Sequence, residues 1–300
     1  MTVITEQDML KIPKSLGGFA LPLILTFAGI AEVPAAPAPP TDPEIFGPGT
    51  VSLPDRHEFC STLSADRKTV YIGIEHGRWQ SMAGHRWNGA NWGAPFYEAG
   101  SPEFTMQDPY LSPDGERLYF ITRSRGSADI AYAERDTSGG WGEPVFLPQP
   151  VNTEANEYYT SLTKDGAIIF ASDARDGGYD LYSAEPEGEG YAKPELFPDG
   201  VNTRRYEADP FIDPDGRYLI FASNRPEGQG RGDIYIAFAE SDGSWSDPVP
   251  IDERVNTSGH ELCPSVTPDG KIFMYTSRQD IYWMSAAFIE DMLKARMAAD

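Results

Sequence analysis

The sequence predicts an all-β fold, a single β-propeller of four-stranded blades, from three observations. A tight-turn motif recurs about every 50 residues, strand-like runs flank each copy, and an isolated outer-strand segment precedes the first copy. The 29 Gly and 26 Pro among 300 residues fit many short strands and turns better than long helices. Length alone does not require more than one domain.

The turn motif is the most regular feature of the repeat. Proline presets φ, Asp can hydrogen-bond the local backbone, and Gly accepts a positive φ, so each copy predicts a hairpin. A degraded copy occupies residues 64–67. The four full copies, whose glycines are 51, 50 and 54 residues apart, are Ser112-Pro113-Asp114-Gly115, Thr163-Lys164-Asp165-Gly166, Asp213-Pro214-Asp215-Gly216 and Thr267-Pro268-Asp269-Gly270.

Each copy also contains two further strands after its hairpin. The second strand of each copy, which is the second arm of the hairpin, is rich in β-branched and aromatic residues, as at 218–222. The third strand is the first one after the hairpin, and it opens with Asp followed by Ile or Leu, as at 233–235. A fourth strand follows an aromatic residue and a proline, as at 141–144. Proline suits an outer edge, where no further strand needs its missing N–H.

The two ends of the repeat region predict how the ring closes. The last copy stops after its third strand at residues 283–284, whereas residues 43–46 match the fourth-strand segment 194–197. We therefore expect residues 43–50 to complete the last blade. A solenoid or tandem hairpins would leave strand edges exposed that a closed ring removes. Five blades are expected, or six if an irregular stretch contains another.

The segments outside the ring have their own signatures. Residues 1–31 carry Lys11 and Lys14 before an apolar run, which predicts a signal peptide, with a buried core helix as the alternative. Residues 32–42 read as a Pro/Ala-rich linker, and the propeller extends over 43–300. Apolar residues at helical spacing predict a short helix from about 285, packed on the ring.

The S-P-D-G turn and the D-I-Y strand resemble those of the WD-repeat-like propeller proteins related to the C-terminal part of TolB. The resemblance covers residues 43–285 and implies the propeller fold. Many members are exported proteins without an assigned activity, and TolB acts through protein contacts in the cell envelope. We expect this chain to lack the separate N-terminal domain of TolB, so the resemblance does not imply membership of the same envelope assembly. It implies a structural role for the turn residues and no specific partner.

The charge narrows the class of ligand. A formal net charge of −22 repels phosphate backbones and anionic lipids, so we expect no nucleic-acid partner and no membrane-embedded state. Cationic or neutral ligands remain open, and acidity that only keeps an exported protein soluble is the alternative. We expect a monomer located in the periplasm or secreted.

Four glutamates recur six residues before the first turn position, where the innermost strand begins. They are Glu58, Glu157, Glu207 and Glu261, with Met106 in the second copy. At one mouth of the channel they would attract a cationic ligand or a hard cation such as calcium. Alternatively, each one hydrogen-bonds the backbone between blades.

The first and last copies share a second pattern inside this ring. His57-Glu58-Phe59-Cys60 matches His260-Glu261-Leu262-Cys263, and ring closure makes these copies neighbours. His57 and His260 could contribute to a metal or ligand site, although strand alternation points them away from the Glu and Cys side chains. Cys60 and Cys263 hold equivalent positions and are expected either to form a disulfide or to remain buried free thiols.

The first copy is irregular and rich in aromatic residues. Trp79 and Trp87, with neighbouring His and Arg residues, could form a stacking platform for a sugar or peptide. Alternatively, these tryptophans pack against a neighbouring blade.

Linear catalytic motifs are lacking, because the sequence has no G-x-S-x-G, H-E-x-x-H, P-loop or C-x-x-C. We therefore predict no catalytic residue and expect a binding or scaffold module for a protein or glycan at the channel mouth. The alternative is a glycan- or peptide-directed hydrolase or lyase that uses the channel carboxylates and His.

Overall fold

The computed structural model describes residues 34–175 and 178–297. The expected signal peptide, residues 1–31, and the first two residues of the linker lie outside the described residues. Residues 34–40 have no regular secondary structure. Within the described chain, no helix has the length and apolar character needed to cross a membrane.

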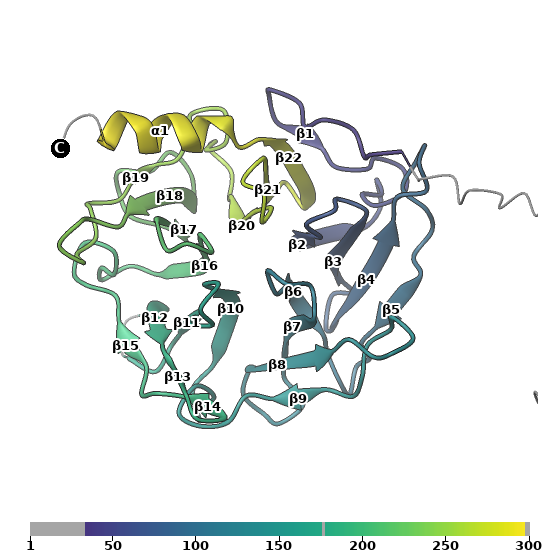
Figure 1. Cartoon of the computed structure of the whole chain (residues 1–300), viewed down its shortest axis with the longest axis horizontal. Helices are drawn as coiled ribbons and strands as arrows, with labels where there is room; N and C mark the ends of the chain where they lie inside the picture. The colour runs from purple at the N-terminus through teal and green to yellow at the C-terminus, as the bar shows by residue number, and fades with distance from the viewer. Residues whose placement is uncertain (1–33, 176–177, 298–300) are drawn as a thin grey trace, which may run out of the picture. The chain divides into compact units, whose positions relative to one another are not determined.

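Five four-stranded antiparallel sheets surround a central axis, as predicted (Figure 1). In four of the five sheets the strand that comes first in sequence lies innermost, whereas in the fifth sheet the first strand of the chain lies outermost. Blade 1 contains β2 (His57–Leu63), β3 (Thr69–Glu75), β4 (Gln80–Arg86) and β5 (Tyr97–Ala99). Blade 2 contains β6 (Gln107–Leu111), β7 (Arg117–Thr122), β8 (Asp129–Glu134) and β9 (Val145–Phe146).

The remaining blades repeat this order. Blade 3 contains β10 (Glu157–Leu162), β11 (Ile168–Ser172), β12 (Asp180–Ala184) and β15 (Glu195–Leu196). Blade 4 contains β16 (Glu207–Ile212), β17 (Tyr218–Ser223), β18 (Asp233–Phe238) and β19 (Val249–Pro250). Blade 5 contains β20 (Leu262–Val266), β21 (Ile272–Ser277), β22 (Asp280–Ser285) and β1 (Glu44–Ile45).

The N-terminal strand closes the ring, which confirms the closure predicted from the ends of the repeat. Strand β1 pairs antiparallel with β22, with Glu44 opposite Trp283. The next residue, Phe46, is buried, and its ring lies 5.1 Å from Trp92 and 5.3 Å from Trp283. Chain segments from opposite ends of the sequence therefore share one sheet and one apolar cluster.

The hairpin turns follow their sequence chemistry, including the degraded copy. Gly115 has a φ of 77° and Gly270 one of 69°. In the copy that lacks glycine, Arg67 takes the same left-handed conformation with a φ of 58°, which a side chain tolerates less well. The Arg67 guanidinium pairs with Asp269 in the turn of blade 5. The arginine that stands in the glycine position of this turn therefore also connects the first and last blades.

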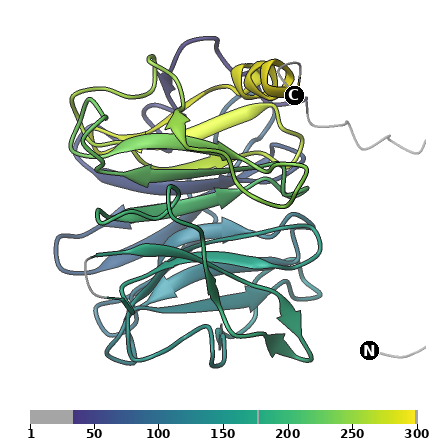
Figure 2. The same cartoon turned by 90° about the vertical axis from the view of Figure 1, so that its left-hand side faces the viewer.

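Two further elements lie outside the ring of strands. The helix α1 (Ala287–Met297) packs Phe288, Ile289 and Met292 onto the apolar cluster of blades 4 and 5, as predicted, and Figure 2 shows it nearly end-on. A small hairpin, β13 (Pro186–Glu187) with β14 (Gly190–Tyr191), is inserted in blade 3 and was not predicted. Gly188 supplies its positive φ of 61°.

Candidate binding site

The inner strands all carry a bulge at the same position, where they pass the axis. The pairing register of each inner strand with its neighbour shifts there by one residue. One non-glycine residue per bulge has a positive φ of 42–55°, a conformation that L-residues rarely adopt. We call these five equivalent residues the waist ring; they are Cys60, Asp108, Tyr159, Asp209 and Cys263.

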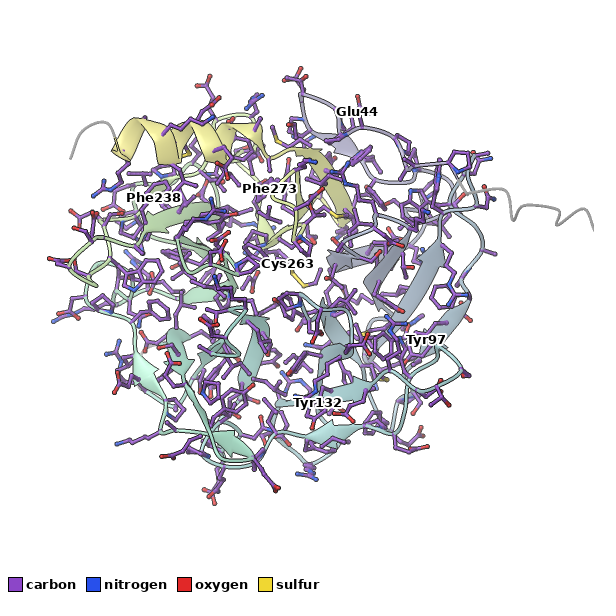
Figure 3. The ribbon with its side chains drawn as sticks, viewed as in Figure 1. Glu44, Tyr97, Tyr132, Phe238, Cys263 and Phe273 are labelled. Atoms are coloured by element: carbon purple, nitrogen blue, oxygen red, sulfur yellow. A yellow bond between two sulfur atoms is a disulfide. The ribbon has the colours of Figure 1, made fainter. Side chains whose placement is uncertain are left out.

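The waist ring lines a small cavity between the inner strands. The cavity there has a volume of about 40 Å³, enough for a few water molecules or one ion. Cys60 and Cys263 form a disulfide with a Cα–Cα distance of 4.9 Å, and Figure 3 shows Cys263 beside the central opening. The bond joins the first blade to the last across 203 residues of sequence.

Two buried carboxyl groups complete the ring. Asp108 Oδ1 lies 3.1 Å from the Cys60 sulfur, and its Oδ2 accepts a hydrogen bond from Gln107. Asp209 accepts hydrogen bonds from the Cys263 backbone N–H, at 2.7 Å, and from Tyr159. Burial raises the pKa of Asp108 to about 8, with a further contribution from Asp209, and burial raises the pKa of Asp209 to about 7.

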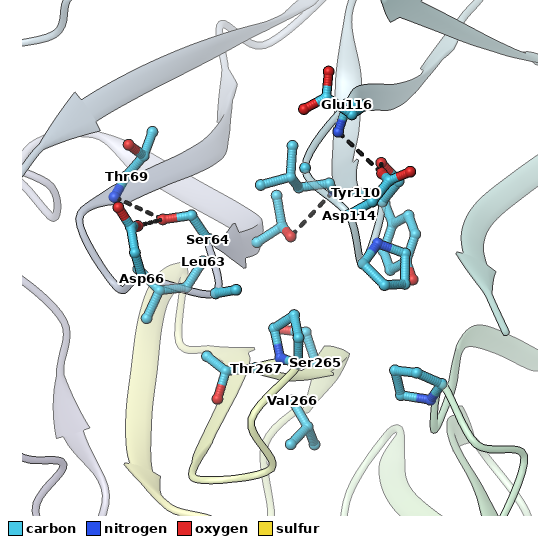
Figure 4. Close-up of a pocket in the computed structure, with 18 of the residues that line it drawn as sticks. Leu63, Ser64, Asp66, Thr69, Tyr110, Asp114, Glu116, Ser265, Val266 and Thr267 are labelled. Atoms are coloured by element: carbon cyan, nitrogen blue, oxygen red, sulfur yellow. Dashed lines mark hydrogen bonds between the residues drawn. The ribbon is translucent and has the colours of Figure 1, made fainter. Parts of the chain in front are cut away.

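A larger cavity opens at the end of the channel that carries the hairpin turns. We call it the turn-side cavity; its volume is about 380 Å³, within the range of small-ligand pockets. Figure 4 shows it between the hairpin turns of blades 1, 2 and 5. Apolar side chains contribute much of its lining, and they are Leu63, Leu111, Phe211, Val266 and Met274.

The rim of this cavity is acidic. Asp66, Asp114 and Glu116 line it and are exposed, and Arg135 is the one basic residue of the lining. The Ser112 hydroxyl donates a hydrogen bond to Asp114 at 2.6 Å and holds the pKa of that carboxyl below its usual value. Asp114 is therefore ionised at neutral pH, and the rim favours a cationic group.

Ion pairs between neighbouring turns shape the outline of this mouth. Lys164 Nζ lies 2.6 Å from Asp215 Oδ1, which joins the turns of blades 3 and 4, and the Lys164 N–H donates to the Pro214 carbonyl. On the other side, Arg67 pairs with Asp269 between blades 1 and 5. The turn-side cavity lies between these contacts and is lined by residues of blades 1, 2, 4 and 5.

The four predicted ligand-binding glutamates lie inside the protein, and none has an exposed surface. Glu207 shows the common arrangement, since it accepts hydrogen bonds from the Thr203 N–H at 2.9 Å and from the Thr203 and Ser223 hydroxyls. Glu157 and Glu261 repeat these contacts with their own Thr and Ser partners.

Glu58 differs because its Oε1 accepts from the Leu53 N–H and from Arg56 in place of the Thr and Ser groups, whereas an arginine, Arg225, also pairs with Glu207. Burial raises the pKa values of Glu58 and Glu157. The four carboxylates are buried and do not border an open mouth. Most of their oxygens accept hydrogen bonds in the loops between blades, although Glu58 Oε2 has no partner among the described residues. The calcium site that the sequence suggests stays a prediction. The geometry of the four carboxylates matches the alternative in which each glutamate hydrogen-bonds the backbone between blades.

The two predicted histidines contact different partners. His57 is about half exposed and its Nδ1 lies 3.9 Å from Glu75. His260 Nε2 is 2.8 Å from the Tyr206 hydroxyl, and burial lowers the pKa of this imidazole.

Strict alternation of side-chain direction does not hold along β2, because the bulge at Cys60 reorients the chain after Glu58. The buried Glu58 side chain therefore points into the loop that precedes β2, and the Cys60 side chain points toward the central axis.

The two predicted tryptophans stand at opposite ends of β4, which has seven residues and spans about 23 Å. Trp79 stacks on His76, with ring centroids 4.0 Å apart. Trp87 packs against Trp92 and donates to the Pro34 carbonyl at 3.0 Å. They do not form a common platform, and among the described residues Trp87 contacts its own blade and the N-terminal segment and not a neighbouring blade.

The waist ring and the turn-side cavity were missed in the sequence. The repeat alignment contains a signal for the ring, because Asp108 and Asp209 stand at the position of Cys60 and Cys263 in their own copies. The cavity has no comparable signal. The residues that line the cavity also serve as ordinary turn and strand residues of the repeat, so the sequence does not distinguish them.

Comparisons with known proteins show the fold alone. The catalytic domain of a GH62 alpha-L-arabinofuranosidase from Coprinopsis cinerea matches with a TM-score of 0.53 at 10% identity, over 82% of this chain and 98% of that one. A candidate TolB from Agrobacterium tumefaciens matches at 0.49 and 19% identity, over 76% and 72%. TolB from Acinetobacter baumannii matches at 0.48 and 16%, over 77% of this chain and about half, 54%, of that one. No family model and no curated protein matches the sequence.

Proposed function

We propose that the chain is a binding module that takes a short segment of a partner protein into the turn-side cavity. The observation that carries this proposal is the combination of an apolar lining with an acidic rim in a cavity of about 380 Å³. An aliphatic side chain would fill the interior and lose contact with water. A neighbouring Lys or Arg would meet the carboxylates of Asp66, Asp114 and Glu116.

The lining favours a peptide over a glycan. Sugars are commonly recognised through the exposed face of an aromatic ring. The aromatic lining residues are Tyr110 and Phe211, and both are largely covered. The Tyr110 hydroxyl is also engaged, since it accepts from the Leu162 N–H at 3.1 Å.

The hydrolase or lyase alternative draws no support from the waist. Asp108 and Asp209 have the raised pKa values that suit acid–base chemistry, but they lie beside a cavity of about 40 Å³ that has no room for a sugar or peptide. The larger cavity is lined by carboxylates that belong to turns or face solvent. We therefore propose binding without turnover.

We also propose that the protein acts in the periplasm or outside the cell. A buried disulfide between distant parts of the chain suits an oxidising compartment. Alkylation of the natively isolated protein that found two free thiols would remove this support.

A displayed library of short random peptides, panned on the full chain, tests the proposal. We expect enriched sequences to pair an aliphatic residue with Lys or Arg, and their affinity to fall with salt. Ala65→Trp, which fills the rim, should weaken binding at least about ten-fold, equivalent to about 1.4 kcal/mol. Ala90→Trp, at another exposed alanine of blade 1, should leave it unchanged.

Charge reversal gives an independent pair of variants. Glu116→Arg at the rim should weaken the same peptides, whereas Glu187→Arg on the β13–β14 hairpin should not. Peptides that bind Ala65→Trp as well as the wild type would overturn the proposed site. Glycan binding, or release of a cleaved product, would overturn the proposed ligand class and favour the enzyme alternative.

A further inference from the structure

The waist ring holds a donor set that the binding proposal does not use. Among the described residues, one group of three Cys, His, Asp or Glu ligand atoms lies within 4.8 Å of one another, and it consists of Cys60, Asp108 and Cys263. All three residues are buried. Two sulfurs and one carboxylate oxygen match the preference of zinc, which binds thiolate at about 2.3 Å and carboxylate at about 2.1 Å.

We propose that reduction of the Cys60–Cys263 disulfide converts the channel waist into a site for a zinc-like divalent cation, held by the two thiolates and Asp108. A dithiol supplies two electrons and two protons, becomes a disulfide itself, and leaves two protein thiols. Binding of the cation then releases to water the two thiol protons and the proton of the Asp108 carboxyl where that group is protonated. In the oxidised form the sulfurs are bonded to each other, so only the carboxylate remains.

Hydrogen bonds fix the positions of the groups that carry the donors. Gln107 Nε2 holds Asp108 Oδ2 at 3.0 Å, which leaves Oδ1 facing the Cys60 sulfur at 3.1 Å. The Thr276 hydroxyl accepts from the Cys60 N–H at 2.9 Å, and Asp209 accepts from the Cys263 N–H at 2.7 Å. Such supporting hydrogen bonds commonly fix the ligands of metal sites.

The space and the charge fit an ion. A cavity of about 40 Å³ accommodates one cation with a water as the fourth ligand. Two thiolates and a carboxylate carry three negative charges in a buried place, and a divalent cation offsets two of them. Thiolate donors select a soft or borderline metal over calcium or magnesium.

Cobalt(II), a coloured substitute for zinc, provides the test. The tag-free full chain is reduced with a phosphine, desalted under nitrogen and titrated with Co²⁺. We expect thiolate-to-cobalt charge-transfer absorption and tetrahedral bands that saturate at one equivalent, disappear when Zn²⁺ is added, and are absent from the oxidised protein. Reduced protein that gives no such absorption overturns the proposal.

Variants and a folding readout separate the site from general metal binding. Asp108→Asn should weaken Co²⁺ binding by more than about ten-fold, while Asp114→Asn in the turn-side cavity should not. Equal affinity of Asp108→Asn and the wild type would exclude the carboxylate as a ligand. If reduction alone unfolds the chain, recovery of its circular dichroism on adding Zn²⁺ supports the site, and failure to recover overturns it. None of these readouts depends on peptide binding.

Discussion

His85 illustrates how burial acts on a single residue. It lies within β4 with no exposed surface, its Nδ1 donates to the Gly93 carbonyl at 3.0 Å, and among the described residues its Nε2 has no hydrogen-bond partner. Burial, aided by Arg56, lowers the pKa of the imidazole. The folded state therefore holds His85 neutral, whereas the unfolded chain protonates it near pH 6.5.

This histidine predicts a loss of stability in mild acid. Because its pKa is depressed on folding, its contribution is complete above pH 6.5 and is lost as the pH falls toward the folded-state value. Between pH 7.5 and pH 5 the free energy of unfolding should fall further in the wild type than in His85→Gln, by at most about 2 kcal/mol for one proton. Denaturant titrations at both pH values measure this difference. His57→Gln, at a half-exposed site, should behave like the wild type, and an identical fall in His85→Gln would refute the assignment.

At the scale of elements, short outer strands depend on side chains of the following loop. Strand β15 has two residues, and Asn202 extends its pairing with β12. The Asn202 amide accepts from the Leu181 N–H at 2.8 Å and donates to the carbonyls of Leu181 and Phe197. Asn152 and Asn256 repeat this arrangement on β8 and β18. Each Val-Asn-Thr loop thus satisfies backbone groups that would otherwise be buried without partners.

We expect Asn202→Ala to cost about 2–4 kcal/mol, since it removes three buried hydrogen bonds of about 1 kcal/mol each. Asn202→Asp should cost a similar amount, because a carboxylate cannot donate to the two carbonyls. Chemical denaturation gives both values. The control is Asn88→Ala in an exposed turn of blade 1, and a cost no greater than in this control would contradict the role given to Asn202.

At the scale of the whole molecule, two features join the first and last blades. Strand β1 completes blade 5 just before the chain enters blade 1, and the Cys60–Cys263 disulfide connects the same blades at the axis. One closure is at the outer edge and the other at the centre. A ring closed at both radii has no free sheet edge between its ends.

Phe46 provides a test of the outer closure. Phe46→Ala should destabilise the protein by about 3–5 kcal/mol, because the side chain is 2% exposed between Trp92 and Trp283. Phe96→Ala, at a phenylalanine that is 39% exposed beside β5, should cost less than about 1 kcal/mol. Denaturant unfolding compares the two variants. Equal costs would mean that the N-terminal segment does not hold the ring closed.

The sequence by itself determined the four-stranded blades and their closure, and it predicted five blades with six as the alternative that the structure excludes. Turn chemistry, strand alternation and proline at outer edges act between residues that are close along the chain, so a repeat of about 50 residues displays them directly. The match of residues 43–46 to 194–197 predicted β1 in the same way. The partners of each glutamate and histidine were not readable, because they depend on loops and bulges that redirect side chains.

Only the tertiary structure decided where the candidate sites lie. The waist ring assembles one residue from each blade, and a bulge at Cys60, Asp108, Tyr159, Asp209 and Cys263 turns each toward the axis. The turn-side cavity depends on which neighbouring turns are joined by Lys164–Asp215 and Arg67–Asp269. Contacts between residues that are 48 to 203 positions apart create both places, so a local pattern does not show where they lie.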